Sequence, residues 1–235
     1  NKDFLLKSIK ISKKEFPNID LVPHFSVLHE FKRNRFNTLN SFIEFLQVVK
    51  NFGCNEVLLV SGSQKRSTLD SVSTLSYLRD HSLFSNNDIS IGVAFNPYLS
   101  GFIFEEEIIK LEKKLQSGLV SSIWIQFGTD CLILESRIEI LRQLICSVKK
   151  NNSVKSNINL FGSILIPSKQ FLARFKYRPW KGVYCSKEFL DSIDFASNLI
   201  IMLLKTYKKN GICPIIETDV STIDKLHSLQ MILQS

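Results

Sequence analysis

The sequence predicts an α/β fold in which parallel strands alternate with helices, organised as a (β/α)8 TIM barrel. Two observations predict it: short apolar segments end in a polar residue, and each is followed by a segment with helical periodicity. The polar residues at these ends include His24, Ser61, Asn96 and Gln126. Because functional groups of such barrels lie at the carboxyl ends of the strands, the pattern also predicts where the site lies.

Six strands are expected from apolar segments rich in Val, Ile, Leu and Phe, a composition typical of strands buried on both faces. They span residues 20–28, 56–60, 89–96, 122–127, 158–166 and 211–217. A closed barrel of this kind needs eight strands. We therefore expect two upstream strand–helix units that this sequence does not contain.

The helices are predicted from apolar residues that recur every three or four positions and from residues that start or stop helices. Pro17 ends the first helix. Asn37 or Thr38 caps the second helix and Gly53 closes it, while Gly118 ends a later helix with an acidic first turn. The predicted helices span residues 4–16, about 37–49, about 68–83, 105–116, 132–149, 168–175, 187–208 and 221–233.

The composition is that of a folded, soluble protein, and we expect a single domain over residues 1–235. The chain is 44% hydrophobic and 22% charged, which is typical of globular domains. No apolar segment approaches the roughly 18–20 residues that span a bilayer, so no membrane partner is expected. The five cysteines are widely spaced and form no CxxC pair, which favours a reducing, cytoplasmic location over a disulfide framework or zinc site.

The net charge of +8 favours an anionic small ligand over nucleic acid. The lysines are spread over many predicted helices and loops, without a basic stripe interleaved with aromatic residues. Neither a Ser-His-Asp order nor a His/Asp/Glu cluster with metal-ligand spacing occurs, so no metal is expected. Apolar helix faces around such a barrel often pair, which allows a homo-oligomer.

Two of the polar strand ends have competing interpretations. His24 is either a contact for a ligand phosphate or ribose, or a buried histidine that binds a backbone carbonyl. Gln126 follows a largely apolar strand, where a polar side chain is costly unless it is paired. A ligand contact is therefore favoured for Gln126, and the alternative is a structural hydrogen bond between loops.

The segment Ser61-Gly62-Ser63-Gln64-Lys65-Arg66 could hold a phosphate through loop amides and its basic side chains. It lacks the glycine pattern of a P-loop, and a solvated loop is the alternative. Lys114 lies in the last turn of a predicted helix, where the helix dipole favours a cation whether or not a ligand is present.

Glu217 ends the last predicted strand, where a carboxylate can serve as a general acid or bind a ribose. The favoured interpretation of this strand end is simpler, namely that Thr218 or Asp219 caps the following helix. Tyr177 and Trp180 could cover a planar ligand, although packing on a neighbouring helix is commoner for such residues.

Several motifs occur together in the order and spacing of one known family. They are Pro23-His24-Phe25-Ser26, Gly62-Ser63, Gly92-Val93-Ala94-Phe95-Asn96-Pro97, the helix end at 111–118 that contains Lys114, Ile125-Gln126-Phe127, and Gly162-Ser163-Ile164-Leu165-Ile166-Pro167. On these motifs the chain resembles the methylenetetrahydrofolate reductase family, from the third strand of its barrel to the eighth.

The resemblance implies an oxidoreductase of folate one-carbon metabolism and methionine biosynthesis. In that family, bound FAD is reduced by NAD(P)H and then passes a hydride to 5,10-methylenetetrahydrofolate. By position, His24, Gly62 and Lys114 would contact the flavin, and Gln126 would hold the folate pterin. The expected cofactor-binding set is completed at the matching strand ends by Ser61, Ser63 and Asn96. The family's catalytic acid, a Glu on the first strand, lies outside this sequence, so the catalytic residue is unknown.

The sequence also departs from the family pattern at the strand ends. Ser63 stands where the family has an Asp that tunes the flavin, and Asn96 stands where a Tyr packs on it. Tyr98 replaces an acidic residue, and Ile125 replaces a Thr. The alternative is therefore a folate-binding or repurposed barrel paralogue that has lost flavin and reductase activity, including a barrel for an unrelated anionic substrate.

Overall fold

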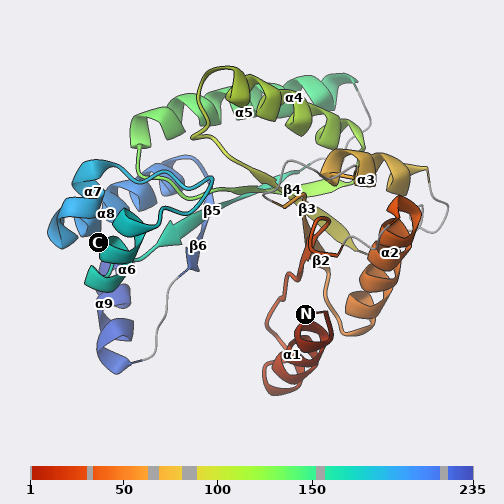
Figure 1. The fold of residues 1–235 in the computed structure, drawn as a ribbon, viewed down its shortest axis with the longest axis horizontal. Coiled ribbons are helices and arrows are strands. Elements are labelled where there is room, and N and C mark those ends of the chain that lie inside the picture. Colours follow the sequence, from red (N-terminus) through yellow and green to blue (C-terminus); the bar gives the residue numbers. More distant parts are fainter. Residues whose placement is uncertain are drawn as a thin grey trace. The chain divides into compact units, whose positions relative to one another are not determined.

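The computed structural model describes residues 2–30, 34–62, 69–80, 89–151, 157–217 and 222–234. Within these ranges the chain forms a parallel six-stranded sheet with the strand order β1-β2-β3-β4-β5-β6 (Figure 1). The strands are β1 (His24–Ser26), β2 (Glu56–Val60), β3 (Ser90–Phe95), β4 (Val120–Ile125), β5 (Asn159–Leu165) and β6 (Cys213–Glu217).

Helices lie between successive strands along the chain, as the alternating pattern of the sequence predicts. They are α1 (Lys2–Glu15), α2 (Arg35–Asn51), α3 (Ser71–Arg79), α4 (Gly101–Gln116), α5 (Cys131–Asn151), α6 (Lys169–Tyr177), α7 (Lys187–Asp191), α8 (Ile193–Lys209) and α9 (Ile223–Gln234). Of the helices in the described ranges, none has the length and apolar character of a membrane span.

The chain divides into two compact units, and each is described by itself. Unit 1 comprises Asn1–Ala94, Lys110–Ser122 and Val148–Ile158, and unit 2 comprises Phe95–Ile109, Ile123–Ser147 and Asn159–Ser235. Closure of the sheet into an eight-stranded barrel, the two upstream units and the single-domain organisation stay predictions.

In unit 1 the helices cover one face of the strands. The ring of Phe25 in β1 lies 4.5 Å from that of Phe42 and 5.3 Å from that of Phe45, both on α2. Phe25 is paired in register with Leu59, and Leu59 is paired with Val93. Successive side chains of a strand point to opposite faces, so these buried residues share the helix-covered face.

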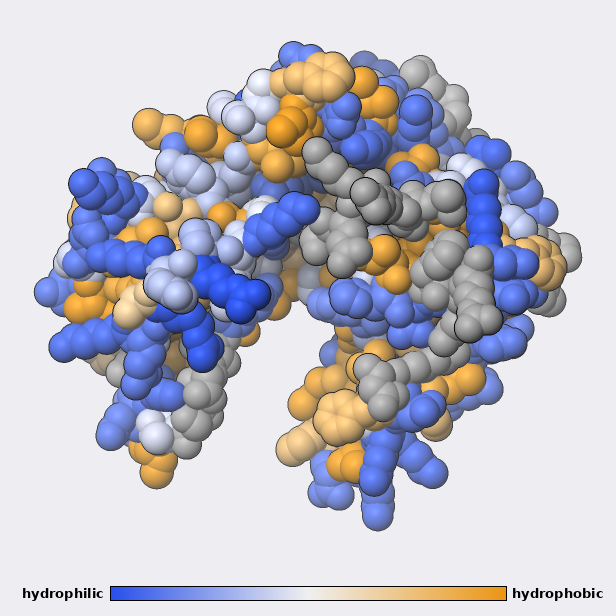
Figure 2. Space-filling model, viewed as in Figure 1, coloured by the Kyte–Doolittle hydropathy of each residue, from blue (hydrophilic) through white to orange (hydrophobic). Residues whose placement is uncertain are grey.

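Helix α1 of unit 1 presents apolar side chains to solvent as well as to the protein. Ile9 is buried, whereas Phe4 is 72% exposed and Ile11 is 53% exposed. Figure 2 shows apolar side chains over this helix among hydrophilic ones. The helix therefore has a mixed surface, in keeping with its many lysines.

In unit 2, helix α8 packs on β5 and β6. The Tyr207 hydroxyl of α8 donates a hydrogen bond to the Ser163 carbonyl at 3.1 Å. Its ring fills the space beside Gly162, where an added Cβ would lie 2.3 Å from a ring carbon. Glycine at this position therefore lets the helix approach the strand closely.

Most predicted elements are present, with shifted ends. Strand β2 has the predicted bounds, and α4 begins at Gly101 rather than at residue 105. The prediction of one helix over 187–208 is wrong, because α7 ends at Asp191 and a new helix begins at Ile193. Ser192 has extended backbone, and its side chain accepts a hydrogen bond from the Phe195 N–H, as an N-cap does.

Candidate ligand-binding face at the strand ends

In unit 2, the face of the sheet opposite the helix-covered one carries aromatic and then polar side chains. Ile123 and Ile125 of β4 are almost fully buried, so Trp124, which alternates with them, lies on the opposite face. The Trp124 ring lies 5.0 Å from the Phe161 ring of β5. These two rings form an aromatic floor that adjacent strands present together.

Gln126 follows the aromatic floor at the carboxyl end of β4. It lies two residues beyond Trp124 and therefore on the same face. Its backbone N–H donates to the Phe95 carbonyl at 2.9 Å, which fixes the position of the residue. The side chain is half-buried, and among the described residues the structure gives its amide no hydrogen-bond partner. The amide can therefore both donate to and accept from a ligand.

Ser163 and Glu217 continue this face on β5 and β6. Ser163 lies two residues beyond Phe161, and its Oγ donates to Oε1 of Glu217 at 2.6 Å. Leu165 and Glu217 are register partners. The Glu217 side chain is exposed, so the carboxylate stands at the strand end with one oxygen oriented by a serine.

A cavity of about 500 Å³ lies beside this carboxylate, at the carboxyl ends of β5 and β6. Its volume is within the usual range for small-molecule sites. Apolar, aromatic, cationic and anionic side chains line it together. They are Leu165, Ile166, Ser168, Gln170, Phe171, Arg174, Trp180 and Glu217.

The aromatic residues of this cavity pack on one another. The Trp180 ring meets the Phe171 ring edge-on at 5.5 Å and the Phe175 ring at 6.0 Å. Trp180 is 45% exposed, whereas Tyr177 is 93% exposed. Trp180 therefore packs on α6, which is the alternative expected from the sequence. Part of its ring also lines the cavity.

Asn96 ties together two loops of unit 2. Its Nδ2 donates to the Gly182 carbonyl at 2.8 Å, and its Oδ1 accepts from the Tyr98 N–H at 3.0 Å. Its own N–H donates to Oε1 of Glu107 at 3.2 Å. These contacts position Asn96 as a structural link, and a flavin contact for it stays a prediction.

Tyr98 is a structural residue that sequence reasoning noted only as a departure from a family pattern. Its ring stacks on Tyr184 at 6.2 Å with an interplanar angle of 10°. Its hydroxyl donates to the Gly128 carbonyl at 3.1 Å. Burial, followed by the charges of Tyr207, Cys131 and Asp130, raises the pKa of Tyr98 well above its usual value, so its phenol remains protonated and donating.

In unit 1, the predicted phosphate-binding segment is partly engaged by the chain itself. Ser61 Oγ accepts from the Ser71 N–H at 3.0 Å. The Asp70 carboxylate caps α3 and accepts from the Ser73 N–H at 2.8 Å. These contacts use amides at the start of α3 that a phosphate would need. Ser63 and the basic residues after it lie outside the described residues.

The capping residue at the amino end of α3 is the carboxylate Asp70. Burial by itself would raise the pKa of Asp70, but hydrogen bonds from Ser73 and the charges of Lys114 and Lys110 together lower it below its usual value. Asp70 is therefore ionised near neutral pH. A carboxylate at this end of α3 opposes a second anion there.

The other predicted contacts in unit 1 are His24, Gly62 and Lys114. His24 is exposed at the first residue of β1, so the alternative of a buried histidine is wrong. Lys114 is only 7% exposed, and its Nζ donates to the Ala94 carbonyl at 3.2 Å. Gly62 has a φ of 92°, a conformation that favours glycine. Ligand contacts by these residues stay predictions.

Sequence reasoning missed a polar cluster at the amino end of β2. The Glu56 carboxylate accepts hydrogen bonds from the Ser122 and Ser121 hydroxyls of β4, the latter at 3.5 Å. Ser122 is fully buried. The adjacent serines Ser121 and Ser122 at the start of a predicted strand were the feature of the sequence that could have indicated this cluster. The cluster satisfies buried polar groups at the strand end opposite to the one where ligands usually bind.

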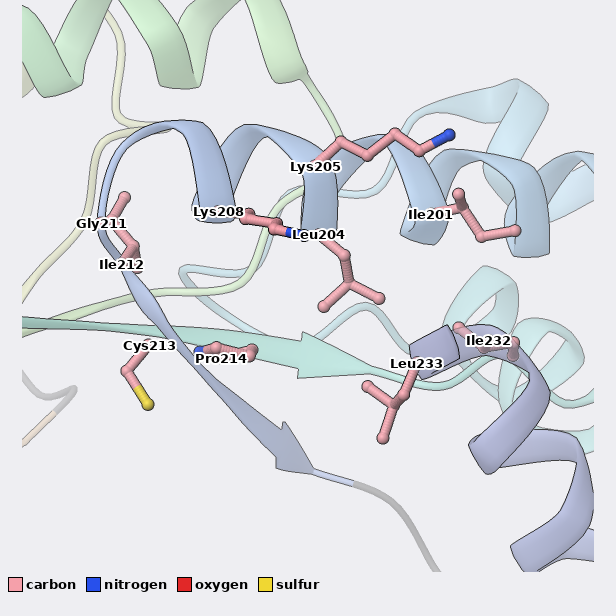
Figure 3. Close-up of a pocket in the computed structure, with 10 residues that line it drawn as sticks. All are labelled: Ile201, Leu204, Lys205, Lys208, Gly211, Ile212, Cys213, Pro214, Ile232 and Leu233. Atoms are coloured by element: carbon pink, nitrogen blue, oxygen red, sulfur yellow. The ribbon is translucent and has the colours of Figure 1, made fainter. Parts of the chain in front are cut away.

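A larger cavity of unit 2, about 610 Å³, lies between α8, α9 and the amino end of β6. Figure 3 shows Leu204 and Leu233 directed into this space, while the Lys205 and Cys213 side chains point away from it. Its lining is mostly apolar. Because ligands of parallel α/β proteins bind at the carboxyl ends of strands, the smaller cavity beside Glu217 is the better candidate.

No protein-family model matches this chain, and no curated protein matches it. Among solved structures it is similar to an uncharacterized protein from Clostridium thermocellum that binds two copies of 5-methyl-5,6,7,8-tetrahydrofolic acid. The two chains are 10% identical, the match covers 98% of each, and the TM-score is 0.48. A likeness this weak carries no inference about ligands, and membership of the methylenetetrahydrofolate reductase family stays a prediction.

Within the described residues, no group of three His, Cys, Asp or Glu side chains is placed to hold a metal ion.

Proposed function

We propose that this protein binds a reduced folate on the face formed by the carboxyl ends of β4, β5 and β6. The observation that carries the proposal is the side-chain amide of Gln126. It has no partner among the described residues and lies beside the Trp124–Phe161 aromatic floor. It is also the residue at which the sequence resemblance places the pterin contact.

The chemistry of this face suits a pterin. A pterin is a planar ring whose edges carry both hydrogen-bond donors and acceptors, and an amide can pair with either kind. Aromatic side chains favour contact with planar rings. The neighbouring cavity of about 500 Å³ contains Arg174, a cation suited to the carboxylates of a folate tail.

Isothermal titration calorimetry with 5-methyltetrahydrofolate tests this proposal. We expect saturable binding to the wild-type chain and about tenfold weaker binding to Gln126→Leu, because the variant loses a ligand hydrogen bond. Gln143→Leu is the matched control, since Gln143 is exposed on α5 and bonds Glu139. Absence of binding to the wild-type chain, or equal loss in both variants, would contradict the proposal.

A flavin-dependent reductase is the second candidate. Gly62 supports it, because its φ is 92° and an added Cβ would lie 2.6 Å from Leu28 Cβ. Glycine is thus required at the position where the resembling family has one. A bound flavin would supply the hydride transfer from NAD(P)H to 5,10-methylenetetrahydrofolate.

The described residues favour folate binding without flavin. Ser61 is engaged by Ser71, Lys114 by the Ala94 carbonyl, and the Asp70 carboxylate occupies the start of α3. Each contact would have to change before a flavin diphosphate could bind there. We therefore expect the chain, incubated with FAD and passed through gel filtration, to elute without visible flavin absorbance. Co-eluting flavin would favour the reductase.

A further inference from the structure

Glu217 lies at the end of a row of polar side chains that crosses three strands of unit 2. The Trp124 and Phe161 rings are neighbours on β4 and β5. Gln126 and Ser163 follow two residues later on these parallel strands and therefore lie side by side on the same face. Ser163 in turn donates to Glu217 on β6 at 2.6 Å.

The Glu217 carboxylate retains capacity to bind a ligand. A carboxylate has two oxygens that each accept more than one hydrogen bond. Ser163 is the one described side chain that donates to it, and it does so to Oε1. Glu217 is exposed and lines the cavity of about 500 Å³. The serine therefore orients the carboxylate without using its second oxygen.

The spacing of the row suits a bicyclic ring. Adjacent strands lie about 4.8 Å apart, so the outer two of three strands are separated by about 10 Å. Gln126 directly follows β4, and Glu217 ends β6. Glu217 is the register partner of Leu165, whereas Ser163 is paired with Ile215, so Glu217 lies two residues nearer the carboxyl end of the sheet than Ser163 does. The interval leaves room for a fused ring with a hydrogen bond at either edge.

The cavity contains a cationic side chain as well as the Glu217 carboxylate. Arg174 also lines it, and its guanidinium has no ion-pair partner among the residues that the structure describes. An anionic ligand can therefore approach Glu217 if it offers hydrogen-bond donors on one edge and a carboxylate elsewhere. A pterin offers two adjacent donors, N3–H and the 2-amino group, which match the two oxygens of a carboxylate.

We propose that Glu217, oriented by Ser163, is the specificity-determining residue that receives the N3–H and 2-amino edge of the pterin, while Gln126 contacts the ring from the opposite side. This inference rests on the proposed folate binding.

The test compares two ligands by calorimetry: 5-methyltetrahydrofolate and its 2-desamino-2-methyl analogue. The wild-type chain should prefer the natural ligand by about 10- to 100-fold, because the analogue loses a charge-assisted hydrogen bond. Glu217→Gln should lose most of that preference, and Ser163→Ala should lose part of it. The matched control Glu105→Gln, exposed on α4, should keep the full preference.

The outcomes separate this inference from the folate-binding proposal. If the wild-type chain binds both ligands equally, or if Glu217→Gln keeps the preference, the role of Glu217 is overturned while folate binding stands. If the wild-type chain binds neither ligand, the folate-binding proposal itself fails and the inference fails with it. Thermal unfolding of each variant establishes that it is folded, which an exposed substitution should allow.

Discussion

The hydroxyl of Tyr98 donates a hydrogen bond to the carbonyl of Gly128 at 3.1 Å, and the tyrosine ring fills the space in which a side chain at residue 128 would stand. An added Cβ at Gly128 would lie 2.4 Å from two ring carbons. The contact links the loop after β3 to the loop after β4. Both loops adjoin the proposed binding face.

Gly128→Ala should lower the free energy of unfolding by about 1–3 kcal/mol, because the new methyl group overpacks a site that the ring already fills. Urea unfolding monitored by circular dichroism measures the change. In a Tyr98→Ala background the same substitution should cost much less, since the ring is gone. An equal cost in both backgrounds would show that the ring is not the cause.

Asp70 should make stability depend on pH in the acid range. Its pKa is lowered in the folded chain, so its stabilising contribution is full above the ordinary carboxyl pKa of about 3.9 and is lost as the pH falls through the lower folded value. Urea unfolding should show wild type about 0.5–1 kcal/mol more stable than Asp70→Asn at pH 7. The difference should shrink as the pH falls below about 4, and a constant difference would contradict this role.

The cysteines should differ in reactivity. Burial raises the pKa of the Cys185 thiol to about 12, whereas Cys146 and Cys213 are exposed. The thiolate is the reactive form. Alkylation with iodoacetamide at pH 8, followed by peptide mass spectrometry, should label the two exposed cysteines first. Labelling of Cys185 should keep rising by about tenfold per pH unit between pH 8 and 10, and labelling as rapid as that of Cys146 at pH 8 would contradict the raised pKa of Cys185.

The strands and their order were predictable because each strand is short, apolar and closed by a polar residue. Local signals were enough for β2, whose bounds match the prediction. They failed at Ser192, because apolar residues recur with helical spacing on both sides of it. The break there depends on one side-chain hydrogen bond to Phe195, which periodicity does not reveal.

The proposed binding face was predictable only in part. Gln126 could be identified because a polar residue at the end of an apolar strand stands out in the sequence. The partners of Asn96 and Lys114 could not be, since Gly182 lies 86 residues from Asn96 and Ala94 lies 20 residues from Lys114. The same holds for Glu217, whose bond to Ser163 joins residues 54 apart.

A crystal structure of this chain with bound 5-methyltetrahydrofolate tests the central claim most directly. We expect the pterin on the face formed by β4, β5 and β6, with one edge on the Gln126 amide and the 2-amino group on Glu217. A ligand found elsewhere, for example in the cavity between α8 and α9, would contradict this account. So would crystals that remain free of ligand at saturating concentration.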